Sequence, residues 1–171
     1  MSLVLFYAYF CVLTETQDTL TGLLNRNVYD HYTKNLYHNV IGMVIVFDLD
    51  GFKQINDQYG HQWGDFCLQM LGSLIKEYFC KMGYCYRIGG DEFCVICETT
   101  NVNQVNDALK LFHEKIDEIR KSNNLQYELP MVSTGYSIFD GSAKEFDIAV
   151  RNADALMYSY KNNRKRNQGI L

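Results

Sequence analysis

One short segment, RIGGDEF at residues 87–93, limits the possible folds of this chain more than any other. Apolar and aromatic residues stand on both sides of it, YCY before and FCVIC after, and both runs are typical of strands. Two successive glycines supply the backbone freedom for a tight reversal, so residues 84–97 predict a β-hairpin whose loop is 89–92. Since hairpin strands are antiparallel, a purely parallel doubly wound sheet is excluded.

The apolar periodicity elsewhere predicts helices around this hairpin. VIGMVIVF at 40–47 is an almost unbroken, β-branched run, which predicts a strand buried on both faces. A short helix that ends at Gly60 and a longer helix opened by HQWGD follow it. Residues 105–121 and 146–160 have the spacing of amphipathic helices. For the second of these we expect five residues to face inward: Ile148, Ala149, Ala155, Leu156 and Tyr160.

Two further segments complete the expected sheet. MVSTGYSIF, which follows Pro130, alternates as a strand does, and NQGIL at 167–171 is a candidate edge strand. With an apolar helical segment at the start of the chain, the order is helix, strand, two helices, hairpin, helix, strand, helix, strand. This order predicts one α+β domain with helices on a mostly antiparallel central sheet.

Composition limits the class of function. The net charge of −4 argues against a nucleic-acid partner, because binding a duplex requires many cations on one surface. Six cysteines without a signal peptide predict free thiols in a reducing, cytoplasmic location. Cys94 and Cys97 point to opposite faces of a strand, which disfavours a shared metal or redox site. The apolar start of the chain is too short to span a bilayer, although it permits membrane tethering of a longer protein.

Acidic residues gather in FDLDGFKQIND (47–57) and in GGDEF (89–93). If the hairpin lies beside the strand that ends at Asp48, carboxylates from the two clusters converge. Carboxylates so close together raise one another's pKa unless a cation holds them ionised. A hard divalent ion with oxygen ligands, Mg²⁺ held together with substrate phosphates, is the simplest explanation. The alternative is two solvated turns that are acidic without a function.

Two other acidic motifs fit this sequence less well. An EF-hand loop needs an acid or amide at its fifth position and glycine at its sixth, where this chain has Phe52 and Lys53. Haloacid-dehalogenase-like phosphatases also begin with DxDG, but they generally place Thr or Val where Phe52 stands, and their parallel sheet does not suit the hairpin.

Basic residues form a third cluster near the C-terminus, which is either a solvated helix end or a phosphate clamp: Lys161, Arg164, Lys165 and Arg166.

From about Asp18 to Leu171 the chain resembles a GGDEF domain, the catalytic module of diguanylate cyclases, which condense two GTP into cyclic di-GMP and two pyrophosphates. The resemblance implies a ferredoxin-like nucleotidyl-cyclase palm at 18–171, preceded by a linker helix at 1–17, of which MSL at 1–3 is typical of an expression-vector remnant. It rests on these blocks: DTLTGLLNR (18–26), FDLDGFKQINDQYGH (47–61), GD (64–65), RIGGDEF (87–93), STG (133–135) and ADALMYSYK (153–161).

The resemblance assigns roles to individual residues. It implies Mg²⁺ (or Mn²⁺) bound by the carboxylates of Asp48 and Asp91 and by the backbone carbonyl of Leu49, with Glu92 as a further ligand or proton acceptor. Losing Asp91 is therefore expected to cost rate far more than fold. Lys53 is expected to contact the substrate phosphates together with backbone N–H groups near Gly51 and Phe52 at a helix start.

Guanine recognition is assigned to Asn56 and Asp65, because a carboxylate accepts hydrogen bonds from a pair of donors that adenine lacks. His61 either contacts the substrate in this pocket or packs between helices. In the basic cluster Lys161 matches the family, Arg164 stands where glycine is usual, and Lys165 takes an arginine position. Lysine cannot make the bidentate fork of arginine, so either Lys165 or Arg166 is expected to contact phosphate.

Regulation and assembly are also implied. Many family members have an R-x-x-D product-inhibition site, but the four matching positions here are Cys80, Lys81, Met82 and Gly83, so we expect no inhibition through that site. Each domain would hold one GTP, so a second GGDEF domain is the expected partner, brought together by an upstream sensor. The alternatives are a silent GTP-binding or protein-interaction module, which the intact acidic motifs disfavour, and a relaxed cyclase that also uses ATP, which Asp65 disfavours.

Overall fold

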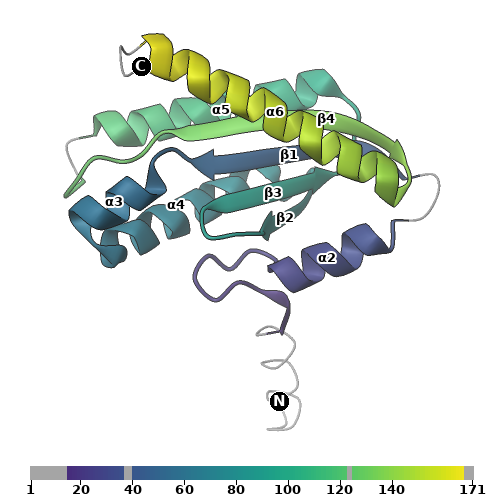
Figure 1. The fold of residues 1–171 in the computed structure, drawn as a ribbon, viewed down its shortest axis with the longest axis horizontal. Coiled ribbons are helices and arrows are strands. Elements are labelled where there is room, and N and C mark those ends of the chain that lie inside the picture. Colours follow the sequence, from purple (N-terminus) through teal and green to yellow (C-terminus); the bar gives the residue numbers. More distant parts are fainter. Residues whose placement is uncertain (1–14, 37–39, 123–124, 168–171) are drawn as a thin grey trace, which may run out of the picture.

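The computed structural model describes residues 15–36, 40–122 and 125–167, and for 165–167 it describes the backbone alone. None of the helices in these ranges is both long and apolar enough to cross a lipid bilayer. The elements (Figure 1) are, in chain order, α2 (Arg26–Lys34), β1 (Val40–Leu49), α3 (Phe52–Tyr59), α4 (His61–Phe79), β2 (Gly83–Arg87), β3 (Glu92–Cys97), α5 (Val102–Lys121), β4 (Val132–Gly141) and α6 (Ala143–Asn167). The predicted order is confirmed from β1 through α6.

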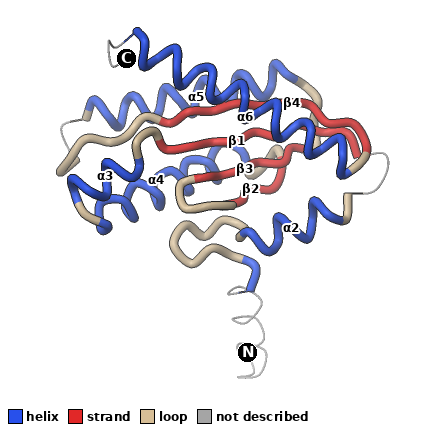
Figure 2. Tube along the Cα trace, in the orientation of Figure 1, coloured by secondary structure: helices blue, strands red, loops and turns tan. Residues whose placement is uncertain are grey.

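The four strands form one antiparallel sheet in the order β2-β3-β1-β4, as Figure 2 shows. This arrangement confirms the predicted α+β class. The hairpin β2–β3 lies directly beside β1, and the pairing sets Asp48 of β1 opposite Glu92 of β3. On its other side, Asp48 lies opposite Ser133 of β4. The register therefore brings both acidic clusters to the same end of the sheet.

The two faces of β1 are buried against different helices. Met43, Ile45 and Phe47 belong to the core formed with α4 and α5. Val44 and Val46 belong to a second core, to which α2 and α6 contribute. Figure 1 shows α6 crossing one face of the sheet while α4 and α5 lie on the other. The prediction that this strand is buried on both faces is confirmed.

The free cysteine thiols were also predicted correctly for the described part of the chain. All five cysteines in the described ranges are unpaired. Cys94 lies in the core under α6, and Cys97 lies in the core under α4 and α5. Because their side chains are separated by the sheet, they cannot share a metal ion or form a disulfide.

The inward face of α6 was predicted wrongly at two positions. Ala155 and Tyr160 are exposed, and 55% of the surface of Tyr160 is accessible. Ala149 is buried as predicted, and Phe146 and Ala153, which were not predicted to face inward, are buried with it at three- and four-residue spacing. The orientation of α6 is fixed where Ala153 meets Gly135 of β4, a contact between backbones that a hydrophobic pattern does not contain. The helix is also longer than predicted, and it includes Asn167, which we had placed in an edge strand.

The short helix α2 was not predicted from the sequence. Its first turn is capped by Asn25, whose side chain accepts a hydrogen bond from the Val28 N–H at 3.1 Å. Tyr29 is its buried residue and packs edge-on against Tyr86, with ring centroids 5.5 Å apart. Gln17, assigned above to a linker helix, forms an isolated bridge with Leu24. The rest of the predicted linker helix, residues 1–14, and the remainder of the C-terminal edge strand, 168–171, lie outside the described residues.

Candidate active site

The candidate site lies where β1 ends, between the hairpin and the C-terminal half of α6. The apolar run of β1 carries the chain out of the core at Asp48, and the turn Asp50–Gly51 leads into α3. Glu92 begins β3 directly opposite Asp48, so the hairpin loop is 88–91 and not 89–92 as predicted. Asp91 stands in that loop, and its charge acts on Asp48. The predicted convergence of the two acidic clusters is confirmed.

Two cations of α6 lie against these carboxylates. The Lys161 ammonium donates to Asp48 Oδ2 and lies 3.2 Å from Asp50 Oδ1. Arg164 Nη2 lies 3.3 Å from Asp50 Oδ2 and donates to the hydroxyl of the buried Ser133. That hydroxyl in turn donates to Asp50 Oδ1 at 2.7 Å. The last turns of α6 are thus fastened to the end of β1 by a network of charged and polar groups.

Burial and neighbouring carboxylates raise the pKa of two acids in this site, Asp48 and Asp154. Partial burial raises the pKa of the Asp48 carboxyl above its usual value, Lys161 opposes this rise, and the charges of Asp91 and Asp50 add to it. Burial alone would lower the pKa of Lys161, but contacts with Asp48 and Asp50 raise it overall. Desolvation and the charges of Glu92 and Asp48 also raise the pKa of Asp154 on α6. Asp154, within the ADALMYSYK motif, is an additional acid of this site that the sequence did not single out.

The donor set fits a hard divalent cation. Carboxylates and a backbone carbonyl are the ligands that Mg²⁺ prefers, and the raised pKa of Asp48 indicates that further positive charge would be stabilising there. In the described ranges, however, no three His, Cys, Asp or Glu side chains are grouped so as to hold a metal ion. Lys161 supplies the positive charge between Asp48 and Asp50.

Arg87 holds the hairpin loop in shape. Its Nε and Nη2 atoms donate to the Gly90 carbonyl at 3.2 and 2.7 Å, and these hydrogen bonds connect β2 to the hairpin loop. Its Nη1 atom donates to both carboxylate oxygens of Asp18, at 3.1 and 3.2 Å. The same carboxylate accepts from the backbone and the hydroxyl of Thr21. Arg87 therefore ties the loop that carries Asp91 to the turn before α2.

We expect Asp18→Asn to lower the free energy of unfolding at pH 7 by about 1–3 kcal/mol, because it weakens a charged hydrogen-bond network. Burial raises the pKa of Asp18, but hydrogen bonds from Thr21 and Arg87 outweigh this, so its pKa lies below the usual value. A lowered pKa stabilises the fold above the unfolded-state pKa, and this contribution is lost as the pH falls through the folded-state pKa. In urea titrations the difference from the parent protein should shrink below about pH 4. An equal difference at pH 3 and pH 7 would contradict this assignment, and the exposed Asp107→Asn is the control.

The predicted guanine-binding residues lie on α3 and α4. The Oδ1 atom of Asn56 is buried and has no hydrogen-bond partner among the described residues. It packs against Gly64, where an added Cβ would come within 1.9 Å of it. His61, Asp65 and Lys53 are exposed nearby on the same two helices. An unpaired buried oxygen beside an exposed carboxylate is an arrangement suited to a ligand that carries hydrogen-bond donors.

Comparison with known proteins fixes the family. The sequence profile described as "Diguanylate cyclase, GGDEF domain" matches residues 15–168. The chain belongs to the GGDEF family. The recognition made from the sequence motifs is confirmed.

Relatives of this GGDEF domain include named enzymes. It is 32% identical over 155 residues to the probable diguanylate cyclase DgcJ of Escherichia coli strain K12, a match that covers 86% of this chain. It is 44% identical over 86 residues to the diguanylate cyclase DgcS of Shewanella oneidensis, covering 47% of this chain. Each match spans 29% of the relative's length.

Solved structures agree on the architecture. The GGDEF domain of DgcB from Caulobacter crescentus, in complex with c-di-GMP, superposes with a TM-score of 0.73 at 26% identity, covering 87% of this chain and 89% of that one. A longer structure with the coiled coil of DgcB gives a TM-score of 0.79 at 23% identity, covering 94% and 87%. The second likeness shows the fold alone.

The basic cluster of this GGDEF domain differs from expectation in one residue. Lys165 and Arg166 lie in α6, but their side chains are outside the described residues, so their predicted phosphate contacts stay predictions. Arg164, at the position where glycine is usual, makes the contacts with Asp50, Ser133 and the Val132 carbonyl. The sequence signal for these contacts is the replacement of the usual glycine by a long cation at position 164.

Proposed function

We propose that this domain is a diguanylate cyclase that condenses two GTP into cyclic di-GMP and releases two pyrophosphates. The observation that carries the proposal is the pairing of Asp48 with Glu92, which gathers the acids of β1 and the hairpin at one end of the sheet. Family membership and the named relatives support it. In each of two steps the 3′-hydroxyl of one nucleotide attacks the α-phosphorus of the other, a new P–O bond forms, and the bond to pyrophosphate breaks.

A divalent ion, Mg²⁺ or Mn²⁺, would be held by the carboxylates of Asp48 and Asp91 and by the Leu49 carbonyl. When bound, it supplies Lewis-acid activation of the hydroxyl and neutralises charge on the departing pyrophosphate. Glu92, exposed at the start of β3, is placed to accept the proton of the attacking hydroxyl or to add a ligand. The hydrogen bonds of Arg87 hold the loop that carries Asp91 in one conformation. The carboxylate is therefore positioned before the substrate binds, and no conformational entropy is lost in ordering it during the reaction.

The triphosphate would be bound by groups at the start of α3 and at the end of α6. Backbone N–H groups at Gly51 and Phe52, where α3 begins, are oriented for an anion, and Lys53 is exposed beside them. Lys161 neutralises Asp48 and Asp50 in the structure, and a bound metal ion would free it for the triphosphate. Lys165 and Arg166 are the further candidates on the same helix.

Guanine would be read by Asn56 and Asp65. After rotation of its side chain, Asn56 could accept from the exocyclic amine of guanine through Oδ1, which is buried and unpaired in the structure, and Asp65 can accept from N1–H and the same amine. Adenine lacks this pair of donors, so a buried acceptor would be left unpaired with ATP. His61, at the first position of α4, is the third candidate for contact with the nucleotide.

Two copies of the domain are required, because each would hold one GTP and the ring closes between two nucleotides. The proposed partner is a second GGDEF domain, brought into position by an upstream sensor or linker. The activity is therefore expected to rise more steeply than in proportion to protein concentration.

The direct test is to incubate concentrated protein with Mg²⁺ and GTP, and separately with ATP, and to identify cyclic dinucleotides by mass spectrometry. Cyclic di-GMP from GTP and no product from ATP are the expected results. If GTP binds and no product forms at high protein concentration, the domain is instead a silent GTP-binding module. Cyclic dinucleotide from ATP at a similar rate would contradict the role of Asp65.

Accumulated cyclic di-GMP is expected not to inhibit the enzyme through the R-x-x-D position. That position lies between the end of α4 and the start of β2, where Cys80, Lys81, Met82 and Gly83 provide neither the arginine nor the aspartate. Initial rates measured with and without added cyclic di-GMP at ten times the protein concentration should agree. A steep loss of rate under these conditions would contradict the prediction.

A further inference from the structure

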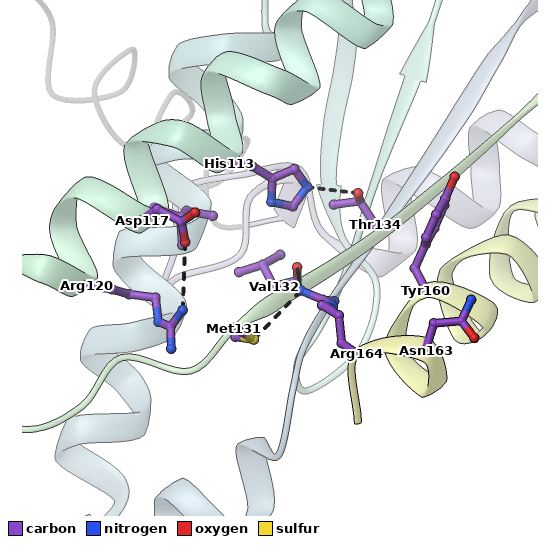
Figure 3. A pocket seen from close by; sticks show the side chains of 10 residues that line it. His113, Asp117, Arg120, Met131, Val132, Thr134, Tyr160, Asn163 and Arg164 are labelled. Carbon is purple, nitrogen blue, oxygen red and sulfur yellow. Dashed lines mark hydrogen bonds and ion pairs between the residues drawn. The ribbon is translucent and has the colours of Figure 1, made fainter. Parts of the chain in front are cut away.

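A cavity of about 490 Å³ lies between α5, the outer edge of β4 and the last turns of α6. Figure 3 shows side chains from all three elements pointing into it. The cavity shares Arg164, a member of the basic cluster, with the candidate active site, and none of the residues proposed to hold the metal ion or guanine lines it. Its polar lining is provided mainly by His113, Asp117, Arg120 and Arg164, with Tyr160 and Asn163 at the α6 side.

Arg120, one of the two arginines of the cavity, has weakly satisfied donors. Arg120 Nη1 and Nη2 lie 3.8 and 3.6 Å from carboxylate oxygens of Asp117 and Glu128, which is beyond ordinary hydrogen-bond length. Its Nε atom donates to the Leu129 carbonyl at 3.1 Å, which holds the guanidinium in place. Arg164 is better paired, because Nη1 donates to the Val132 carbonyl at 3.3 Å and Nη2 contacts Ser133 and Asp50. The Arg120 guanidinium could therefore form better hydrogen bonds with an oxyanion.

His113 gives the cavity a neutral polar group. Its Nε2 atom lies 3.0 Å from Thr134 Oγ1, and Nδ1 has no hydrogen-bond partner among the described residues. Burial and the charge of Arg164 lower the pKa of His113, so the ring is neutral near pH 7. Ile116 and Val132 also line the cavity, but each is only 2% exposed, whereas Tyr160 is 55% exposed. The lining thus combines cationic donors with an exposed aromatic ring.

We propose that this cavity binds a small organic anion, a phosphate or carboxylate carried on an apolar body. The anionic group would contact the guanidinium of Arg120, with Arg164 supplying further positive charge, and the body would lie against the ring of Tyr160. Arg164 also holds Asp50, so a bound anion competes with Asp50 for the same guanidinium. The cavity is thereby linked to Asp50, and through Lys161 to Asp48. Binding does not depend on the proposed cyclase activity and is measured without nucleotide.

The experiment follows the imidazole NMR resonances of the 171-residue protein while phenyl phosphate or benzoate is added. The resonances of His113 should shift in a saturable manner, and those of His61, in the proposed nucleotide pocket, should not. Benzyl alcohol, which has a similar ring and no charge, should leave His113 unshifted. The tighter of the two anions identifies whether a phosphate or a carboxylate is preferred.

The variants Arg164→Gln and Arg120→Gln should each weaken the apparent affinity about tenfold, since each removes a charged hydrogen-bond donor. Arg151→Gln is the matched control, an exposed arginine of the same helix roughly 20 Å away along its axis. Three results would overturn the proposal: shifts at His61 and none at His113, equal shifts with benzyl alcohol, or unchanged affinity in both variants. If Arg164→Gln does not fold, the affinity of the Arg120→Gln variant for the two anions tests the proposal.

Discussion

Asp91→Asn should reduce the rate of cyclic di-GMP formation by about 100-fold or more, the usual cost of removing a charged group that stabilises a transition state. Asp91 stands in the hairpin loop, and its charge acts on Asp48 across the site. Asparagine keeps the size of the side chain and removes the charge on which the divalent ion depends. Rates are measured at saturating GTP and Mg²⁺, with the metal affinity obtained separately by titrating Mn²⁺.

The same substitution should leave the fold intact. In the described part of the structure the Asp91 side chain makes no hydrogen bond or ion pair. The melting temperature of the Asp91→Asn variant should therefore stay within about 2 °C of that of the parent protein. Asp107→Asn, an exposed acid of α5, is the control for rate and stability. Full activity in Asp91→Asn would eliminate the metal assignment, and a large fall in melting temperature would mean that Asp91 is structural.

Gly135→Ala should destabilise the domain by about 2–3 kcal/mol, since it overpacks a contact between backbones. An added Cβ would lie 2.1 Å from the Ala153 carbonyl oxygen and 2.6 Å from the Met157 nitrogen. Neither atom can move without shifting α6 away from β4, and α6 carries Lys161 and Arg164. The expected fall in melting temperature is about 6–10 °C, and urea titration gives the free energy directly.

A second glycine provides the control for this prediction. Gly90 has no atom within 4 Å of an added Cβ, so Gly90→Ala should change the free energy of unfolding by less than about 1 kcal/mol. Equal stabilities for the two variants would show that α6 can move outward at no cost. Reduced Mn²⁺ affinity in Gly135→Ala would further indicate that the position of α6 influences the acidic site.

Local signals in the sequence were sufficient for much of the fold. The β-branched run of β1, the apolar runs on both sides of the hairpin loop and the spacing of apolar residues in α4 and α5 each determine an element by short-range chemistry. The adjacency of Asp48 to the hairpin was only a condition in the sequence analysis, and the pairing of β3 with β1 establishes it. Helix α2 was not predicted because it is short and polar. The sequence features that mark it are the N-terminal cap at Asn25 and a single buried residue, Tyr29.

By itself, therefore, the sequence determined the α+β class, the family, and the two acidic clusters that meet at the end of β1. Only the tertiary structure decided which face of α6 is buried, because that depends on Ala153 meeting Gly135. It also decided that Arg87 braces the hairpin loop on Asp18 and that Arg164 pairs with Asp50. Lys161 and Asp48 stand 113 residues apart in the chain, and no periodicity links them. Their ion pair exists because packing brings the end of one helix to the end of one strand.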